Sequence, residues 1–144
     1  MRTTLRTKNS ENYVRVGVAA IVRHHNKVLL GMRLSSHGKN TWGFPGGKLE
    51  FGETFKQCVN REVLEETGLK VRKLKFVAVT NDIFNSETHY ITIFMVCYWK
   101  SGKERVMESD KLSEWKWFDW EKLPKPLFLP IINLLKQKFN PLKV

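Results

Sequence analysis

Two glutamates stand four residues apart in the segment GGKLEFGETFKQCVNREVLEETGL, residues 46–69. On an α-helix, at about 100° per residue, Glu62 and Glu66 fall on one stripe with Phe55 and Val59. That stripe should pack against a core, where an unpaired carboxylate is strongly unfavourable. A bound cation would offset the charge, and carboxylate oxygens suit Mg²⁺ or Mn²⁺. The spacing therefore predicts that Glu62 and Glu66 hold a divalent metal ion.

The alternative for any Glu-rich helix is an exposed face laced with charges. Two glycines before it favour a site, because Gly46 and Gly47 allow a tight backbone path that can approach a metal or a phosphate. Glu65 lies slightly round the same helix, within reach of the ion or its water shell. Arg61 points elsewhere, and its planar guanidinium could hold a carboxylate.

The elements that must position these residues follow from local patterns. Thr54 and Gln57 form a capping box and Gly68 suits a helix C-terminus, which predicts a helix over about residues 54–67. Upstream, aliphatic runs on either side of RHHN predict a β-hairpin with His24 and His25 in its turn. A loop and the short extended piece WGFPGG, residues 42–47, then lead to the helix.

Downstream of the helix, residues 74–84 and 88–100 read as two strands. The second is so continuously apolar that both of its faces should be covered, which places it in the middle of a sheet. Residues 113–120 alternate aromatic and polar side chains as a further strand, and residues 127–139 resume helical spacing. Strands flanked by two helices without regular alternation indicate an α+β or sandwich arrangement.

Length and composition set the broad class. With 144 residues and 42% hydrophobic residues, the chain is sized for one domain, residues 1–144. Its apolar runs are too short for a membrane span, which needs about 20 residues, so we expect a soluble protein. The N-terminus has basic residues but no apolar segment typical of a secretory signal, so we expect a cytoplasmic location. Cys58 and Cys97 lie far apart and should be small buried residues.

The net charge of +11 is unevenly distributed. Residues 47–69 hold five acids and three bases, a net charge of −2, so the remainder carries +13. An acidic patch in basic surroundings suits a divalent cation together with a phosphorylated substrate. The simpler interpretation is that the lysines keep the surface solvated.

At this point the sequence resembles a known family. Gly47, Glu53 and the run Arg61-Glu62-Val63-Leu64-Glu65-Glu66-Thr67-Gly68-Leu69 match the Nudix box, G-x5-E-x7-R-E-U-x-E-E-x-G-U, at every position. The segments VLLGMRLSS, FPGGKLEFGET and WKWFDWEKLPKPLF resemble plant cytosolic Nudix hydrolases and human nucleotide-pool MutT homologues. The resemblance implies the Nudix fold, an α/β/α sandwich with a mixed sheet. It also implies Mg²⁺-dependent hydrolysis of a nucleoside diphosphate linked to another group.

The resemblance further implies roles for individual residues. Glu62 and Glu66 would be the principal metal ligands, Glu65 a further ligand or base, and the Gly46 carbonyl a backbone ligand. Arg61 would orient the carboxylates, with Glu53 supporting the site from the loop. An additional acid outside the box is expected at Glu108, or secondly at Asp110. Candidates for contact with the substrate are Arg33, Trp42, Phe44 and Gly47.

Three function classes follow. The first is a nucleoside triphosphate pyrophosphohydrolase that releases a monophosphate and pyrophosphate, with oxidised nucleotides such as 8-oxo-dGTP among its substrates. The second uses the same site on capped or triphosphorylated RNA, although the scattered basic residues make stable nucleic-acid binding an unfavoured reading. Pterin triphosphates or prenyl diphosphates are further alternatives. The third class is a non-catalytic binding module, and the intact Nudix box argues against it.

The aromatic segment near the C-terminus carries an expectation about assembly. It holds more bulky apolar groups than one strand edge readily buries, so we expect a homodimer in which part of it contacts a second copy. The competing interpretation is that it lies under the C-terminal helix of its own chain. The residues concerned are Trp115, Trp117, Phe118, Trp120, Leu127 and Phe128.

Overall fold

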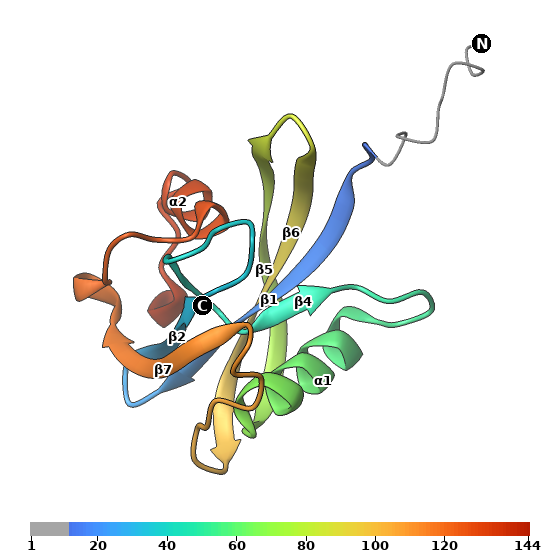
Figure 1. Ribbon diagram of the computed structural model, residues 1–144. Helices are drawn as coiled ribbons and strands as arrows, with labels where there is room; N and C mark the ends of the chain where they lie inside the picture. The colour runs from blue at the N-terminus through green and yellow to red at the C-terminus, as the bar shows by residue number, and fades with distance from the viewer. Residues whose placement is uncertain (1–11) are drawn as a thin grey trace.

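A computed structural model describes residues 12–144 (Figure 1). The expectation about the N-terminal segment falls largely on residues 1–11, which lie outside the described residues. No helix in residues 12–144 is long and apolar enough to cross a bilayer. The elements, in chain order, are β1 (Arg15–His24), β2 (Lys27–Arg33), β3 (Trp42–Gly43), β4 (Gly46–Lys48), α1 (Phe55–Thr67), β5 (Lys70–Asn85), β6 (Thr88–Ser101), β7 (Leu112–Asp119), η1 (Trp120–Lys122), α2 (Leu129–Leu135) and η2 (Pro141–Lys143).

The strands form one mixed sheet. Its main order is β3-β2-β1-β6-β5, with β4 paired to β1 and β7 paired to β2. The β1–β6 pairing is parallel and the other pairings are antiparallel. The predicted mixed sheet is therefore confirmed, and β6 lies between β1 and β5 as the apolar run indicated.

The two main helices cover opposite faces of this sheet, α1 one face and α2 the other (Figure 1). Side chains of β6 alternate between the two cores: Met95 and Cys97 pack on the α1 side, whereas Phe94 and Val96 pack on the α2 side. Both faces of β6 are thus covered, and the fold is the predicted α/β/α sandwich. Cys58 and Cys97 are both buried and free, as expected.

Helix α1 begins and ends where its caps predict. The Thr54 side chain accepts a hydrogen bond from the Gln57 backbone, the reciprocal bond is present, and Gly68 adopts a left-handed conformation with φ of 79°. Val59 is buried, but Phe55 is 38% exposed, so the expectation that Phe55 packs into the core is wrong. The first turn of the helix has too little of the protein over it to enclose a phenyl ring.

Three other expectations need adjustment. In the β1–β2 hairpin, His25 and Asn26 form the turn with positive φ, whereas His24 is the last residue of β1. Strand β5 begins at Lys70, four residues before the expected start, and runs past an irregularity in its pairing near Lys73. Helix α2 is confined to residues 129–135, because the backbone at Phe128 is still extended and a turn follows Leu135.

The aromatic segment is packed within its own chain, on both faces of the sheet. Trp115 and Trp117 belong to the core on the α1 side, and Phe118, Trp120 and Leu127 pack on the α2 side. The excess of bulky groups that motivated the dimer is thus accommodated by two cores, so the segment needs no second copy to bury it.

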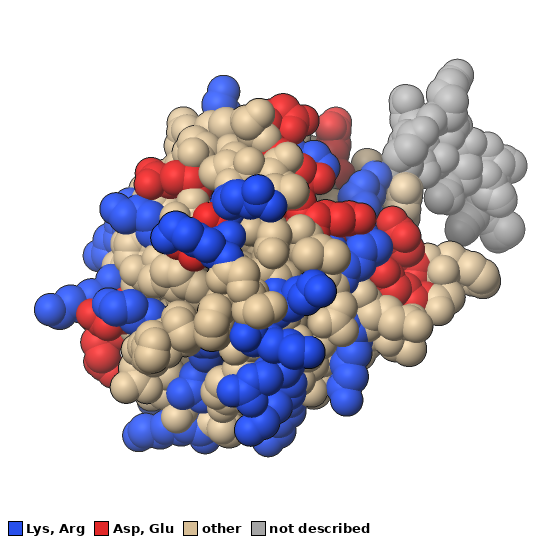
Figure 2. Space-filling view, turned by 90° about the horizontal axis from the view of Figure 1, so that it is seen from below, with Lys and Arg blue, Asp and Glu red and all other residues tan. Residues whose placement is uncertain are grey.

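The surface carries the expected positive charge. Figure 2 shows Lys and Arg side chains dominating the lower part of the face seen from below, with few acids among them. The edge strand β5 contributes exposed bases at Lys70, Arg72, Lys73 and Lys75.

Candidate active site

Helix α1 presents Glu62 and Glu66 to the two glycines of β4. The Gly46 backbone N–H donates to Oε1 of Glu66 at 3.0 Å. A Cβ atom at Gly47 would stand 2.2 Å from Oε2 of Glu62, and one at Gly46 would stand 2.2 Å from the Val18 carbonyl oxygen. Only glycine therefore lets β4 pass between β1 and the carboxylates at this separation.

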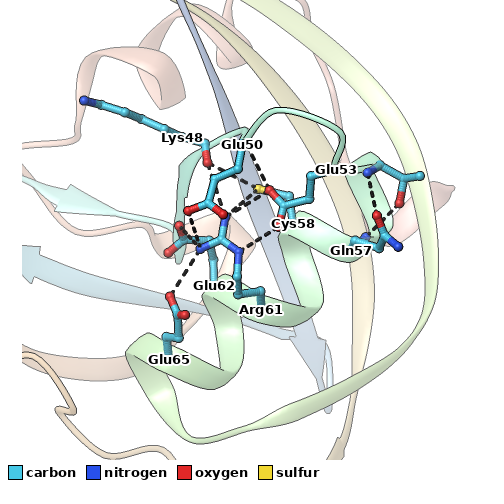
Figure 3. Close-up of polar contacts among 9 residues, drawn as sticks. Lys48, Glu50, Glu53, Gln57, Cys58, Arg61, Glu62 and Glu65 are labelled. Atoms are coloured by element: carbon cyan, nitrogen blue, oxygen red, sulfur yellow. Dashed lines mark hydrogen bonds and ion pairs between the residues drawn. The ribbon is translucent and has the colours of Figure 1, made fainter.

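Arg61 connects the acidic side chains around it (Figure 3). Its guanidinium donates to Glu53 through Nε and Nη2, and to Glu62 through Nη1 at 3.0 Å. Nη1 also lies 3.3 Å from Oε1 of Glu65 and 3.8 Å from Oε2 of Glu50. Arg61 thus holds carboxylates, as its guanidinium chemistry predicted.

The acids near Arg61 differ in their electrostatic environment. Its hydrogen bonds lower the pKa of Glu53 to about 2, so Glu53 is charged at any ordinary pH. Burial raises the pKa of Glu66 to about 8, although the hydrogen bond from the Gly46 N–H lowers it. The negative charges of Glu62 and Glu108 raise the pKa further, and the charge of Arg33 opposes them. Burial likewise raises the pKa of Glu62. Glu62 thus shares the Arg61 guanidinium with Glu53, whereas the hydrogen bond to Glu66 comes from the neutral Gly46 N–H.

The predicted additional acid, Glu108, lies close enough for its charge to act on both Glu62 and Glu66. Its loop is fastened to the helix, because the Met107 N–H donates to the Glu66 carbonyl at 3.4 Å. Trp115 Nε1, from β7, donates to the same oxygen at 3.1 Å. Asp110 is exposed in the same loop.

A cavity of about 420 Å³ opens beside these carboxylates, a volume typical of small-molecule sites. At one end it is lined by Glu62, Glu66 and the β4 glycines, and Lys48 and Lys111 also line the cavity. At the other end its walls are apolar and aromatic, and they come from β6, the end of β5, the loop after β2 and the start of α2. The residues of this aromatic end are His37, Phe84, Tyr90, Phe94, Phe128 and Ile131.

Arg33 lies between the two ends. Its guanidinium carbon is 3.8 Å above the Phe128 ring, and Nη2 donates to the His37 carbonyl at 3.1 Å. Its Nε is buried without a hydrogen-bond partner in the described residues, and burial lowers the pKa of the group against the charge of Glu66. Arg33 lines the cavity, as a phosphate contact would require.

The aromatic end is a connected cluster of rings. His37 stacks on Tyr90 with ring centres 5.4 Å apart and meets Phe84 edge to face at 4.9 Å. Phe84 and Phe128 are 5.4 Å apart. Burial and the nearby charge of Arg33 lower the pKa of His37, which favours the neutral form of its ring.

The structure distributes the predicted substrate residues unevenly. Arg33, Phe44 and Gly47 line the cavity, but Trp42 packs against Phe118 in the core on the α2 side. His37, Phe84, Tyr90 and Phe128 were not among the sequence candidates. Their only sequence signal is aromatic character, which is equally typical of a core.

The donor set fits a divalent cation at Glu62 and Glu66. Both offer oxygen ligands to the same cavity, and the buried Glu66 accepts a hydrogen bond from the neutral Gly46 backbone N–H. Glu65, which was expected beside them, is half exposed and pairs with Arg61. Residues 12–144 contain no cluster of three metal-ligating side chains.

The fold and the site together indicate the class of this protein. An acidic helix packs over a strand that contains two glycines, on a mixed sheet with a helix on each face. Residues 12–137 match the NUDIX domain. The chain belongs to the NUDIX family.

Individual relatives agree with this assignment. The chain is 34% identical over 104 residues to the oxidized purine nucleoside triphosphate hydrolase of Danio rerio, covering 72% of this chain and 65% of that protein. It is 34% identical over 87 residues to the 8-oxo-dGTP diphosphatase of Proteus vulgaris, covering 60% and 78%. The crystal structure of a MutT NUDIX hydrolase from Burkholderia pseudomallei superposes with a TM-score of 0.79 at 30% identity, covering 85% of this chain and 97% of that one.

Proposed function

We propose that the protein is a Mg²⁺-dependent pyrophosphohydrolase of nucleoside triphosphates, which releases a nucleoside monophosphate and pyrophosphate. One observation carries the proposal: the same cavity holds the carboxylates Glu62 and Glu66 at one end and aromatic rings at the other. A nucleotide has the matching form, with anionic phosphates at one end and a flat base at the other. Oxidised purine nucleotides such as 8-oxo-dGTP are the first candidates, because relatives are named for them.

Each part of the cavity has a role in this proposal. Glu62 and Glu66 would hold the Mg²⁺, or Mn²⁺, with the Gly46 backbone beside them. When bound, such an ion lowers the pKa of water and neutralises charge on phosphoryl oxygens. Glu65, or Glu108 from its loop, would take the proton of the attacking water.

The remaining charged residues would act by position. Arg61, which donates to both Glu53 and Glu62, keeps Glu62 turned toward the cavity. Arg33, Lys48 and Lys111 line the cavity and supply positive charge for the phosphate chain.

A substrate panel tests the proposal. Purified protein with Mg²⁺ is offered canonical and oxidised nucleoside triphosphates, ADP-ribose and capped RNA, and pyrophosphate release is scored against orthophosphate release. We expect pyrophosphate from triphosphates. The matched control is the Glu62→Gln/Glu66→Gln double variant, and hydrolysis by this variant at the wild-type rate, or none by the wild type, would contradict the proposal.

A second candidate function is hydrolysis of RNA 5′ ends at the same site. Two observations favour it: the exposed bases of β5, and 34% identity over 107 residues to the NAD-capped RNA hydrolase NudC of Vibrio atlanticus, of which the match covers 38%. Activity on RNA that falls steeply with salt would support it, because contacts to the phosphate backbone release counterions.

We infer a homodimer in the cytoplasm, where two free buried cysteines are compatible with a reducing environment. The aromatic segment is buried in its own chain. The dimer contact is therefore better served by exposed apolar side chains of β5, namely Phe76, Val79 and Ile83. Light scattering at micromolar concentration tests this: a particle near the 16.9 kDa mass of one chain would exclude the dimer.

A further inference from the structure

A buried carboxylate stands behind the aromatic end of the cavity. Asp82, on β5, is fully buried. It accepts hydrogen bonds from Thr80 Oγ1 at 2.9 Å, from Thr92 Oγ1 at 2.5 Å and from Asn133 Nδ2 at 2.8 Å. Asp82 does not belong to the end of the cavity that holds Glu62 and Glu66, and it takes no part in the proposed proton transfers. Three donors converge on it from β5, β6 and α2.

One of these donors faces the cavity. Thr92 lines it, whereas Thr80 and Asn133 are not among the described residues that do. A threonine hydroxyl has a single hydrogen, and that of Thr92 is given to Asp82. Toward a ligand, Thr92 Oγ1 can therefore act only as a hydrogen-bond acceptor.

The surroundings make this acceptor selective. On the neighbouring strand Gly17 is paired with Thr92 and has no side chain to cover the floor of the cavity. Tyr90 and Phe94 flank Thr92 on the same face of β6, and both line the cavity. A ligand that presents an N–H here completes a hydrogen bond to the free lone pair of Thr92 Oγ1, and one without it leaves that lone pair unused.

We propose that Thr92 is a specificity-determining residue, whose Oγ1 selects nucleobases that carry an amino group on the edge directed at the sheet. The inference rests on the proposed function, because it takes the cavity to be a nucleotide site. Asp82 and Asn133 act as positioning residues that fix the direction of the Thr92 hydroxyl.

The test compares ligands that differ by one amino group. Guanosine and inosine monophosphates differ only in the N2 amino group, and the monophosphates of adenosine and purine riboside differ only in the N6 amino group. Binding is measured by calorimetry and does not depend on turnover. We expect wild-type protein to bind the amino member of at least one pair about tenfold more tightly, the size of one neutral hydrogen bond.

The decisive comparison is Thr92→Val against Thr80→Val. Each removes one hydrogen bond to Asp82 and keeps the side-chain shape, so a purely structural role predicts the same effect for both. We expect Thr92→Val to bring the affinity ratio close to one, while Thr80→Val and the hydroxyl-retaining Thr92→Ser keep the wild-type ratio. If Thr92→Val does not fold, loss of the ratio in Thr92→Ala, with retention in Thr92→Ser, carries the same conclusion.

Several results would overturn the inference. These are a wild-type ratio near one in both pairs, a ratio that survives Thr92→Val, or a ratio lost equally in Thr80→Val. The proposed function fails separately: a protein that binds amino-bearing nucleotides through Thr92 but hydrolyses no triphosphate would refute the hydrolase and leave the binding site standing.

Discussion

The guanidinium of Arg61 holds the carboxylate of Glu53 by two hydrogen bonds, Nε to Oε2 at 2.7 Å and Nη2 to Oε1 at 3.0 Å. This paired geometry ties the loop before α1 to the helix itself. The third nitrogen of the same guanidinium donates to Glu62. The position of Glu62 thus depends on Glu53 through Arg61.

Arg61→Lys should lower kcat at least tenfold while the protein stays folded. Lysine keeps the charge but cannot donate to Glu53 and Glu62 with one rigid planar group. Steady-state hydrolysis of the best triphosphate substrate measures the effect. Arg72→Lys, on exposed β5, is the matched control and should behave as wild type. Equal kcat values for the two variants would contradict the orienting role.

Glu66→Gln should lower kcat by at least about 100-fold, roughly 3 kcal/mol, as for removal of one electrostatic stabiliser. The amide can still accept the Gly46 N–H bond, so circular dichroism and the melting temperature without metal should show a folded protein. Turnover at the wild-type rate would remove Glu66 from the site.

The stability of the metal-free protein should fall as pH rises from about 5 to about 8. In the folded state the pKa of Glu66 is about 8, above its ordinary value of 4.5, so the folded state binds more protons than the unfolded state between these values. The contribution is about 1.4 kcal/mol per pH unit at most. Thermal melts across this range measure the slope, and Glu66→Gln should flatten it.

Millimolar Mg²⁺ should raise the melting temperature without substrate, and more at pH 8 than at pH 6. Binding to the folded state stabilises it, and below pH 8 the ion must first displace a proton from Glu66. The Glu62→Gln/Glu66→Gln variant should not respond to Mg²⁺, and without metal it should be no less stable than wild type. A wild-type melting curve unmoved by Mg²⁺ would argue against a preformed metal site.

Two alanine substitutions on β4 should have different effects. Gly47→Ala meets the carboxylate of Glu62, a side chain that can move, so it should abolish the Mg²⁺ response with a small loss of stability. Gly46→Ala meets the backbone carbonyl of Val18, which is fixed in β1, so it should destabilise the fold itself. Melting temperatures with and without Mg²⁺ separate the two, and equal loss of stability would contradict this account.

Sequence reasoning located the acidic end of the cavity because its determinants are local. Thr54, Gln57 and Gly68 fix the ends of α1, and helical spacing then places Glu62 and Glu66 on one side. Helical spacing does not tell how far the sheet extends beneath the helix, so Phe55 was wrongly expected in the core.

The aromatic end could not be predicted in this way. Its rings come from the loop after β2, from β5, from β6 and from the residue before α2, and only the sheet brings these segments together. Trp42 was a candidate for contact with the substrate because it shortly precedes Gly46 and Gly47 in the sequence. The chain turns its ring into the core instead, against Phe118 on β7.

The parallel pairing of β1 with β6 has a consequence for how the chain folds. It joins residues 75 positions apart, such as Arg23 and Tyr98, and we expect so long-range a ladder to form slowly. Thr92 meets Gly17 only through that pairing, whereas Arg61 can meet Glu53 within eight residues. During refolding we expect the acidic helix and its arginine to be organised before the pocket for the base exists, and nucleotide binding to be regained last.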